Sequence, residues 1–194
     1  QNGKLFVADT QNHRVLIWNS IPNQNNQAAD VVIGQKDFTT AFAPAAGVFV
    51  NAAANLLLSP ASVTSDGTHL FVADLGYNRV LIWNGIPTSN DTPANVVIGQ
   101  ADMTGELPNN TPAVCGSAGK DSNGNPIYPA MCAASLNFPR FVLPDGRGRL
   151  FIADGGNDRV LIFNSIPIAN GASADRVLGQ PDFFTDTASD PSIS

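Results

Sequence analysis

The sequence has few of the residues from which most enzyme active sites are built. Among 194 residues there are 2 histidines and 2 cysteines, and Glu106 is the single glutamate. Charged residues make up 13% of the chain, well below the roughly 25% that is usual in globular domains. No nucleophile elbow, phosphate-binding loop or CxxC spacing occurs. These absences favour a protein that is not an enzyme, and they predict neither a cofactor nor a metal site.

Basic clusters and long hydrophobic runs are also missing. The net charge is -6 with a pI near 4.6, and no basic cluster is longer than Arg147–Arg149. Such an acidic chain is repelled by nucleic acid and by anionic lipid headgroups. The most apolar stretch, residues 41–58, is interrupted by Pro44 and Gly47, and no run approaches the roughly 18 apolar residues needed to span a bilayer. The sequence therefore predicts neither nucleic-acid binding nor membrane insertion.

The chain contains three copies of one sequence module. The copies read LFVADTQNHRVLIWNSIP from Leu5, LFVADLGYNRVLIWNGIP from Leu70 and LFIADGGNDRVLIFNSIP from Leu150. Each copy is followed, always at the same distance, by VIGQ or VLGQ. A fixed internal spacing with gaps of different length between the copies indicates a repeat architecture.

Each module predicts a series of short strands. LFVAD and RVLIW are rich in β-branched and aromatic residues and flank a polar turn, and the VVIGQ phrase predicts a further strand. Segments 59–67 and 138–146 end in Asp-Gly and predict one more strand ahead of the second and third modules. Four antiparallel strands per unit are typical of a propeller blade. We therefore predict an all-β chain of about three blades, half of a six-bladed β-propeller.

The predicted boundaries follow from the repeat. Because the chain starts inside a module and without Met, we interpret it as processed or truncated. The segments are blade 1 without its first strand (1–40), an inter-blade insert (41–58), blade 2 (59–104), a Cys-containing insert (105–136), blade 3 (137–184), and the start of a further insert or tail (185–194).

The modules resemble the NHL repeat, whose motif joins an Asp-Gly turn, a Val-Ala-Asp strand end and an Asn-x-Arg-Val strand start. The residues that carry the resemblance are Asp9, Asn12, His13 and Arg14, then Asp74, Asn78 and Arg79, then Asp154, Asn157 and Arg159. The resemblance implies a propeller of such blades. Some NHL-type propellers are enzymes, among them an amidating lyase with a zinc site of several histidines, and this chain alone does not supply that set.

All large insertions lie between the last strand of one blade and the first strand of the next. In a four-stranded antiparallel blade these loops emerge at the same end as the turn between the second and third strands, so we expect one elaborated face. This face predicts contact with a protein or glycan partner. Its candidate contact residues are Asn12, His13, Tyr77, Asn78, Asn157, Asp158 and Glu106.

The repeated Asp and Arg residues are interpreted as scaffold rather than site. A reactive site rarely needs the same pair three times, so the Asp side chains are expected to accept turn amides while the Arg stems pack on the neighbouring blade. Trp18, Trp83 and Phe163 share one strand position and predict core packing. The Gly-Gln-x-Asp phrases ending at Asp37, Asp102 and Asp182 predict side-chain to backbone bonds that close each blade. The turn 154–158 superficially resembles a calcium loop, but its twelfth position is Ser165 rather than Glu, which leaves a weak calcium site as the alternative.

Cys115 and Cys132 lie in one Gly/Pro/Asn-rich insert and predict a disulfide, with two free thiols as the alternative. A disulfide there favours an oxidising compartment, hence a secreted, periplasmic or cell-surface protein.

The function predicted from the sequence is therefore an extracytoplasmic binding scaffold. Two alternatives stay open. In one, the chain is part of a propeller enzyme, a lyase or hydrolase, whose active site needs blades absent here. In the other, an exposed blade edge recruits further copies, and self-association completes the propeller or builds an array.

Overall fold

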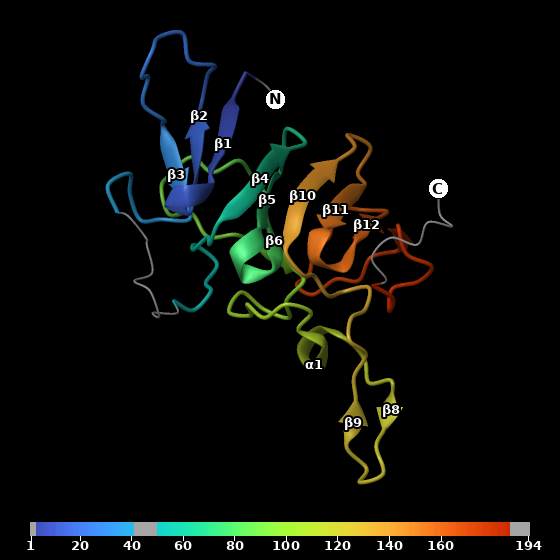
Figure 1. The fold of residues 1–194 in the computed structure, drawn as a ribbon. Helices are drawn as coiled ribbons and strands as arrows, with labels where there is room; N and C mark the ends of the chain where they lie inside the picture. The colour runs from blue at the N-terminus through green and yellow to red at the C-terminus, as the bar shows by residue number, and fades with distance from the viewer. Residues whose placement is uncertain (1–2, 41–49, 187–194) are drawn as a thin grey trace.

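The computed structural model describes residues 3–40 and 50–186. They form an all-β chain of three large antiparallel sheets and one small hairpin, with one short α-helix, α1 (Thr111–Val114). Figure 1 shows the three large sheets side by side, with the second between the first and the third. The described residues do not close into a ring. The all-β prediction is confirmed, whereas a closed propeller is not seen.

The strands follow one another across each sheet in chain order, as a repeated meander does. The first sheet holds β1 (Leu5–Asp9), β2 (Arg14–Trp18) and β3 (Val31–Ile33). The second sheet holds β4 (Pro60–Ser65), β5 (Leu70–Asp74), β6 (Arg79–Trp83) and β7 (Val96–Ile98). The third sheet holds β10 (Pro139–Pro144), β11 (Leu150–Asp154), β12 (Arg159–Phe163) and β13 (Arg176–Leu178).

The turn after each LFVAD or LFIAD strand is a short 3-10 helix rather than a plain polar hairpin turn. These helices are η1 (Thr10–Asn12), η2 (Leu75–Tyr77) and η3 (Gly155–Asn157). Each ends in a residue in the left-handed region, with φ of 55° at His13, 52° at Asn78 and 49° at Asp158. His, Asn and Asp are the non-glycine residues that adopt this conformation most readily, which explains the polar residue at this point in every module.

Two hydrophobic cores lie between the sheets. Val15 and Ile17 of the first sheet pack against a row on the second sheet that includes Trp83, and the opposite face of the second sheet packs against the third. Strand β6 is therefore buried at every position, whereas β2 alternates between buried and half-buried residues. The predicted core role holds for Trp83 and Phe163, at 1% and 2% exposed, but Trp18 is half-buried because it lies on the outer face of the first sheet.

The insert between the second and third sheets carries a feature that the sequence analysis left undescribed. Strands β8 (Gly119–Lys120) and β9 (Pro126–Ile127) form a hairpin that projects from the body of the molecule (Figure 1). At its base Cys115 and Cys132 form a disulfide, as predicted. Within the described residues, no helix has the length and apolar character needed to cross a membrane.

Candidate binding face

Each module places an Asp at the end of one strand opposite an Arg at the start of the next, because the two are register partners across the turn. In the second and third sheets the Arg Nε donates to the Asp Oδ2 at 2.9 Å (Asp74, Arg79) and 2.8 Å (Asp154, Arg159). Both of these ion pairs are fully buried, with side chains 0% exposed. The corresponding pair of the first sheet, Asp9 and Arg14, is 23% and 19% exposed.

The buried arginines hold the inserts in place. Arg79 Nη1 donates to the carbonyl of Met103 at 2.7 Å, while its Nη2 donates to the carbonyls of Ala53 at 3.0 Å and Leu56 at 2.8 Å. One guanidinium therefore fixes the insert before its sheet and the segment after it. Backbone carbonyls that would otherwise lie buried and unpaired are satisfied in this way.

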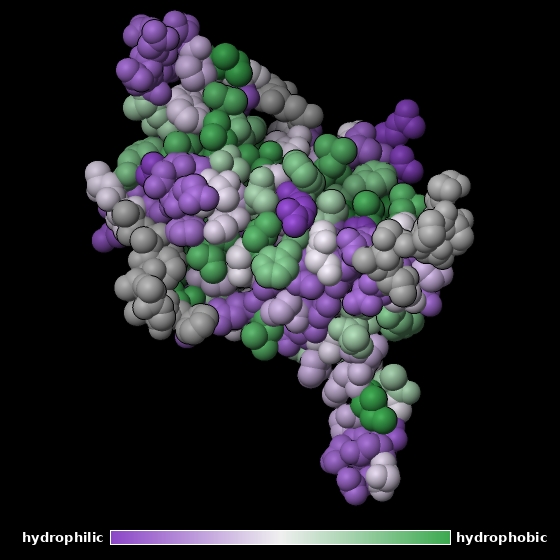
Figure 2. Space-filling model, in the orientation of Figure 1, coloured by the Kyte–Doolittle hydropathy of each residue, from purple (hydrophilic) through white to green (hydrophobic). Residues whose placement is uncertain are grey.

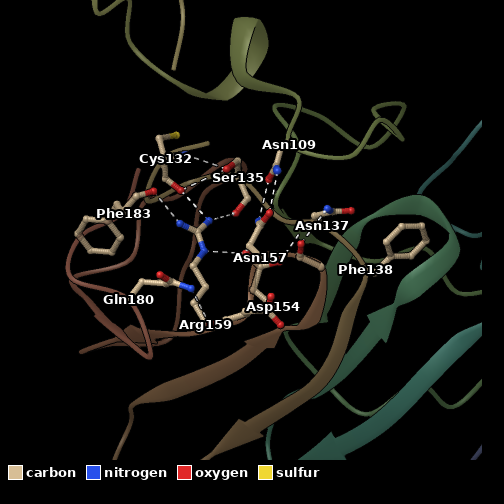
Figure 3. A network of polar contacts seen from close by, with 12 residues as sticks. Asn109, Cys132, Ser135, Asn137, Phe138, Asp154, Asn157, Arg159, Gln180 and Phe183 are labelled. Carbon is tan, nitrogen blue, oxygen red and sulfur yellow. Dashed lines mark hydrogen bonds and ion pairs between the residues drawn. The ribbon is translucent and has the colours of Figure 1, made fainter. Parts of the chain in front are cut away.

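Arg159 repeats this arrangement in the third sheet (Figure 3). Its guanidinium donates to the carbonyl oxygens of Phe183, Cys132 and Ser135. The aspartates join in, because Asp74 Oδ1 accepts the amide of Leu58 and Asp154 Oδ1 accepts the amide of Asn137, both at 2.7 Å. This corrects the sequence interpretation: the Asp and Arg pair with each other and bind inserts, instead of serving turn amides and a neighbouring blade separately.

Burial sets the direction of the pKa shift of the aspartate in each of these two buried pairs. Burial raises the pKa of Asp74 to about 6, with the guanidinium of Arg79 and the amide of Leu58 opposing that rise. Burial likewise raises the pKa of Asp154. Since both carboxylates are surrounded by protein donors, the raised pKa values reflect burial and do not mark an acid exposed to a substrate.

Three of the predicted contact residues are buried, so they cannot reach a partner. Tyr77 is 2% exposed and its hydroxyl donates to the carbonyl of Val50 at 2.8 Å. Asn78 is 5% exposed, donating to the carbonyl of Glu106 and accepting the amide of Phe138, both at 3.0 Å. Asn157 is 1% exposed and shares hydrogen bonds with Asn109 and Asp154 (Figure 3). All three secure inserts.

The other four predicted contact residues are at least partly accessible but do not converge on one site. Asn12 and Asp158 are exposed, at the turns of the first and third sheets. His13 is half-buried; its Nδ1 accepts the amide of Ser59 at 2.9 Å, and burial lowers its pKa. Glu106 is half-buried and accepts the amide of Ala52 at 3.2 Å. They come from the turns of the first and third sheets and from the insert between the second and third sheets, so they predict a broad face and no pocket.

Exposed apolar residues that the sequence analysis missed lie on the projecting hairpin and in the segment of the same insert before α1. Ile127 is 48% exposed, Tyr128 36% and Leu107 60%. Figure 2 shows a small hydrophobic area on an otherwise hydrophilic hairpin. The dipeptide Asn123-Gly124, a strong hairpin signal, would have located this element.

A cavity of about 330 Å³ lies at the base of the hairpin. Its lining includes the two disulfide cysteines, Ser117, Ser173 and Phe184. None of the described residues that line this cavity is an acid, a base or a histidine. It adds a concave surface to the same face.

A metal site is not evident in the part of the chain that the structure describes. No group of three or more His, Cys, Asp or Glu residues is placed to hold an ion there. At the turn 154–158, both oxygens of Asp154 are engaged by protein donors. The structure therefore offers no support for the calcium alternative at this turn.

The Gly-Gln-x-Asp phrases join the end of the last strand to the turn. Gln100 Nε2 donates to the carbonyl of Asn78 at 3.0 Å, Gln180 makes the same bond to Asp158 at 3.2 Å, and Gln35 bonds to Asn12. The aspartates then cap the next turn: Asp37 Oδ1 accepts the amides and hydroxyls of Thr39 and Thr40. Side-chain to backbone bonds therefore close each unit, as expected.

Replacing Thr40 by valine is expected to raise the pKa of Asp37. The hydroxyl of Thr40 is the largest cause that lowers this pKa from 3.8 to about 2, followed by the hydroxyl of Thr39. Because the folded pKa lies below the unfolded value, the turn stabilises the fold above pH 3.8, and this stabilisation is lost as the pH falls through about 2. Carboxyl-carbon NMR titration measures the shift, with Asp102, whose pKa is lowered by Thr104, as the internal control. An unchanged Asp37 midpoint would contradict the assignment.

The chain matches no protein-family model, and no curated protein matches it.

Proposed function

We propose that this chain is an extracytoplasmic binding scaffold, built as an NHL-like half-propeller, whose insert-bearing face contacts a protein or glycan partner. The observation that carries the proposal is the attachment of the inserts. Buried Arg79 and Arg159 hold the backbone of both inserts against the sheets. Loops fixed on a rigid framework are the usual place for binding residues.

The chemistry of the projecting hairpin supports contact with a macromolecule. An exposed aliphatic and an exposed aromatic side chain, Ile127 and Tyr128, stand next to a turn rich in amides and backbone polar groups. Tyrosine gives a partner both an apolar ring and a hydroxyl, and asparagine amides offer hydrogen bonds to peptide or sugar groups. Few charged groups compete with these contacts, since only 13% of the residues are charged.

The disulfide supports the proposed location. Cys115 and Cys132 close the base of an insert that has little core of its own, and such bonds persist in oxidising compartments. We therefore place the protein outside the cytoplasm, in secreted, periplasmic or cell-surface form.

Replacing Ile127 by serine together with Tyr128 by alanine is expected to weaken partner binding about tenfold or more, because residues at the centre of an interface carry most of its energy. Wild-type protein is applied to a glycan array and to an array of extracellular proteins, and each bound spot is then titrated with the variant. The matched control is Ile168→Ser, since Ile168 is 90% exposed in the connection between β12 and β13.

Comparing binding by the hairpin variant and by Ile168→Ser tests whether the hairpin contacts the partner. Weaker binding by the hairpin variant, with wild-type binding by Ile168→Ser, supports the proposed face. Equal binding by the wild type and the hairpin variant places the contact elsewhere and overturns the role of the hairpin. Thermal unfolding of both variants at the wild-type midpoint confirms that neither change has disturbed the sheets.

A further inference from the structure

The same loop joins each sheet to the one before it. The connection between the last two strands of the second sheet reaches back to β3, where Asn90 Oδ1 accepts the amide of Val32 at 3.0 Å and the amide of Asp91 donates to the carbonyl of Val32 at 3.1 Å. We call a loop of this kind a clamp loop: an Asn followed by a residue of positive φ, here 58° at Asp91. It pairs with the outward amide and carbonyl of a strand that would otherwise be a free edge.

The second boundary repeats the clamp atom for atom. Asn170 Oδ1 accepts the amide of Val97 in β7 at 3.0 Å, and the amide of Gly171 donates to the carbonyl of Val97 at 2.9 Å. The φ of Gly171 is 63°. The junction of the first and second sheets and that of the second and third sheets therefore contain the same two hydrogen bonds.

One clamp loop is left over at one end of the molecule. The first sheet carries the same sequence feature at Asn25 and Asn26, and Asn26 has the same positive φ of 58°. Both residues are exposed, and no described residue forms a hydrogen bond with their side chains. This loop has the clamping conformation at Asn26, but no strand of the described ranges lies in its clamp.

One clamp target is left over at the other end. Val177 of β13 corresponds to Val32 and Val97, but no clamp loop within the described ranges reaches it. Every residue of β3 and β7 is buried, whereas Arg176 and Leu178 beside Val177 are exposed, Leu178 at 54%.

The outer faces of the first and third sheets both present apolar side chains. The outer face of the first sheet presents Val7, Leu16 and Trp18, whose counterparts on the second sheet are buried at 0–1% against a neighbour. The outer face of the third sheet presents Phe151, Ile162 and Leu178. At the internal boundaries, rows of this kind form the cores.

We propose that a second copy of this chain docks head-to-tail, with Asn25 and Asn26 of one copy clamping Val177 of the other and the outer face of the first sheet packing on that of the third. Each copy has both ends, so two copies can make the contact twice and close a ring of six sheets. This inference stands independently of the proposed binding function.

The contact between copies is expected to be weaker than the internal boundaries. Inside the chain, Leu57 and Leu136 close over Gly34 and Gly99. No leucine of the described residues covers Gly179 in the third sheet. We therefore expect the pair to dissociate on dilution.

Sedimentation equilibrium of the 194-residue chain over a range of concentrations tests the proposal. The expected result is a reversible change from 20.3 kDa to twice that mass. Asn25→Ala is expected to weaken association about 30-fold, because each of the two contacts loses one hydrogen bond worth roughly fivefold. Gln24→Ala, a change in the same exposed loop, is the matched control and leaves association unchanged.

A mixing experiment separates a real head-to-tail contact from nonspecific association. Leu178→Asp places a charge on the target face, and it is expected to abolish self-association. A mixture of Asn25→Ala and Leu178→Asp proteins keeps one intact contact, between Asn25 of the second variant and Val177 of the first. Labelled Leu178→Asp protein, which should not associate with itself, should therefore bind to Asn25→Ala protein.

Several outcomes would overturn the proposal. A monomer at every concentration excludes the second copy as occupant of the third sheet. Association that Asn25→Ala does not weaken, or a Leu178→Asp protein that does not bind the Asn25→Ala protein, excludes the clamp. Assemblies larger than a pair exclude the closed ring.

Discussion

Replacing Arg79 by methionine is expected to lower the free energy of unfolding by about 3–5 kcal/mol, the usual cost of removing one partner from a buried ion pair. The substitution leaves the carboxylate of Asp74 buried without its cation. It also leaves the carbonyls of Ala53, Leu56 and Met103 without their donor. Methionine restores most of the volume, so the loss reports the missing charge and hydrogen bonds. Urea denaturation followed by tryptophan fluorescence measures it.

The chain carries its own control for this result. Arg14→Met makes the same change in the same motif, but the ion pair of Arg14 with Asp9 is partly exposed, at 19% and 23%. Within the part of the chain that the structure describes, Arg14 donates to one backbone carbonyl, that of Phe38. We expect a cost of about 1 kcal/mol, as for other solvated pairs. Equal costs for the two variants would refute the argument that burial and insert attachment set the value of the pair.

Replacing Gly99 by alanine is expected to cost about 3 kcal/mol. Gly99 has a φ of 92°, and a Cβ there would lie 2.7 Å from Leu136 Cδ1 and 2.8 Å from Leu136 Cβ. The positive φ alone costs roughly 1–2 kcal/mol for an L-residue. Displacing a leucine that is 0% exposed adds an overpacking cost of about 1–3 kcal/mol.

The strain and the clash can be separated by a second glycine. Gly148 has a φ of 90°, and a Cβ there would meet nothing within 4 Å. Gly148→Ala should therefore cost only the backbone share of about 1–2 kcal/mol. If Gly99→Ala costs no more than Gly148→Ala, Leu136 yields without penalty, and the leucine does not fix the insert.

The sheets could be predicted from the sequence because their signals are local and written more than once. Alternating apolar residues, polar turns and Asp-Gly dipeptides place strands within a residue or two of where they lie, and the module repeats that evidence. The third sheet illustrates this: segment 138–146 was expected to hold a strand, and β10 spans Pro139–Pro144. The position of the inserts at the Asp–Arg end followed from strand order alone.

The burial of individual polar residues could not be predicted in the same way. Tyr77, Asn78 and Asn157 sit in turns, where polar residues usually face water. They are buried because inserts fold over the turns and bring carbonyl and amide groups to them. That contact depends on segments without repeat or periodicity. The pairing of Asp74 with Arg79 depends on the geometry of the turn, which makes the two residues register partners.

The disulfide separates the segment that carries the projecting hairpin from the rest of the chain. Between Cys115 and Cys132 nearly every residue is exposed from 116 to 130, while the two Cα atoms stand 6.0 Å apart. The sheets touch little of that segment, so its sequence and length are under weak structural constraint. Any loop whose two ends lie that far apart can be attached at the same disulfide. Under the proposed binding function, specificity can thus evolve, or be engineered, by exchanging the segment between the two cysteines while the repeat modules stay unaltered.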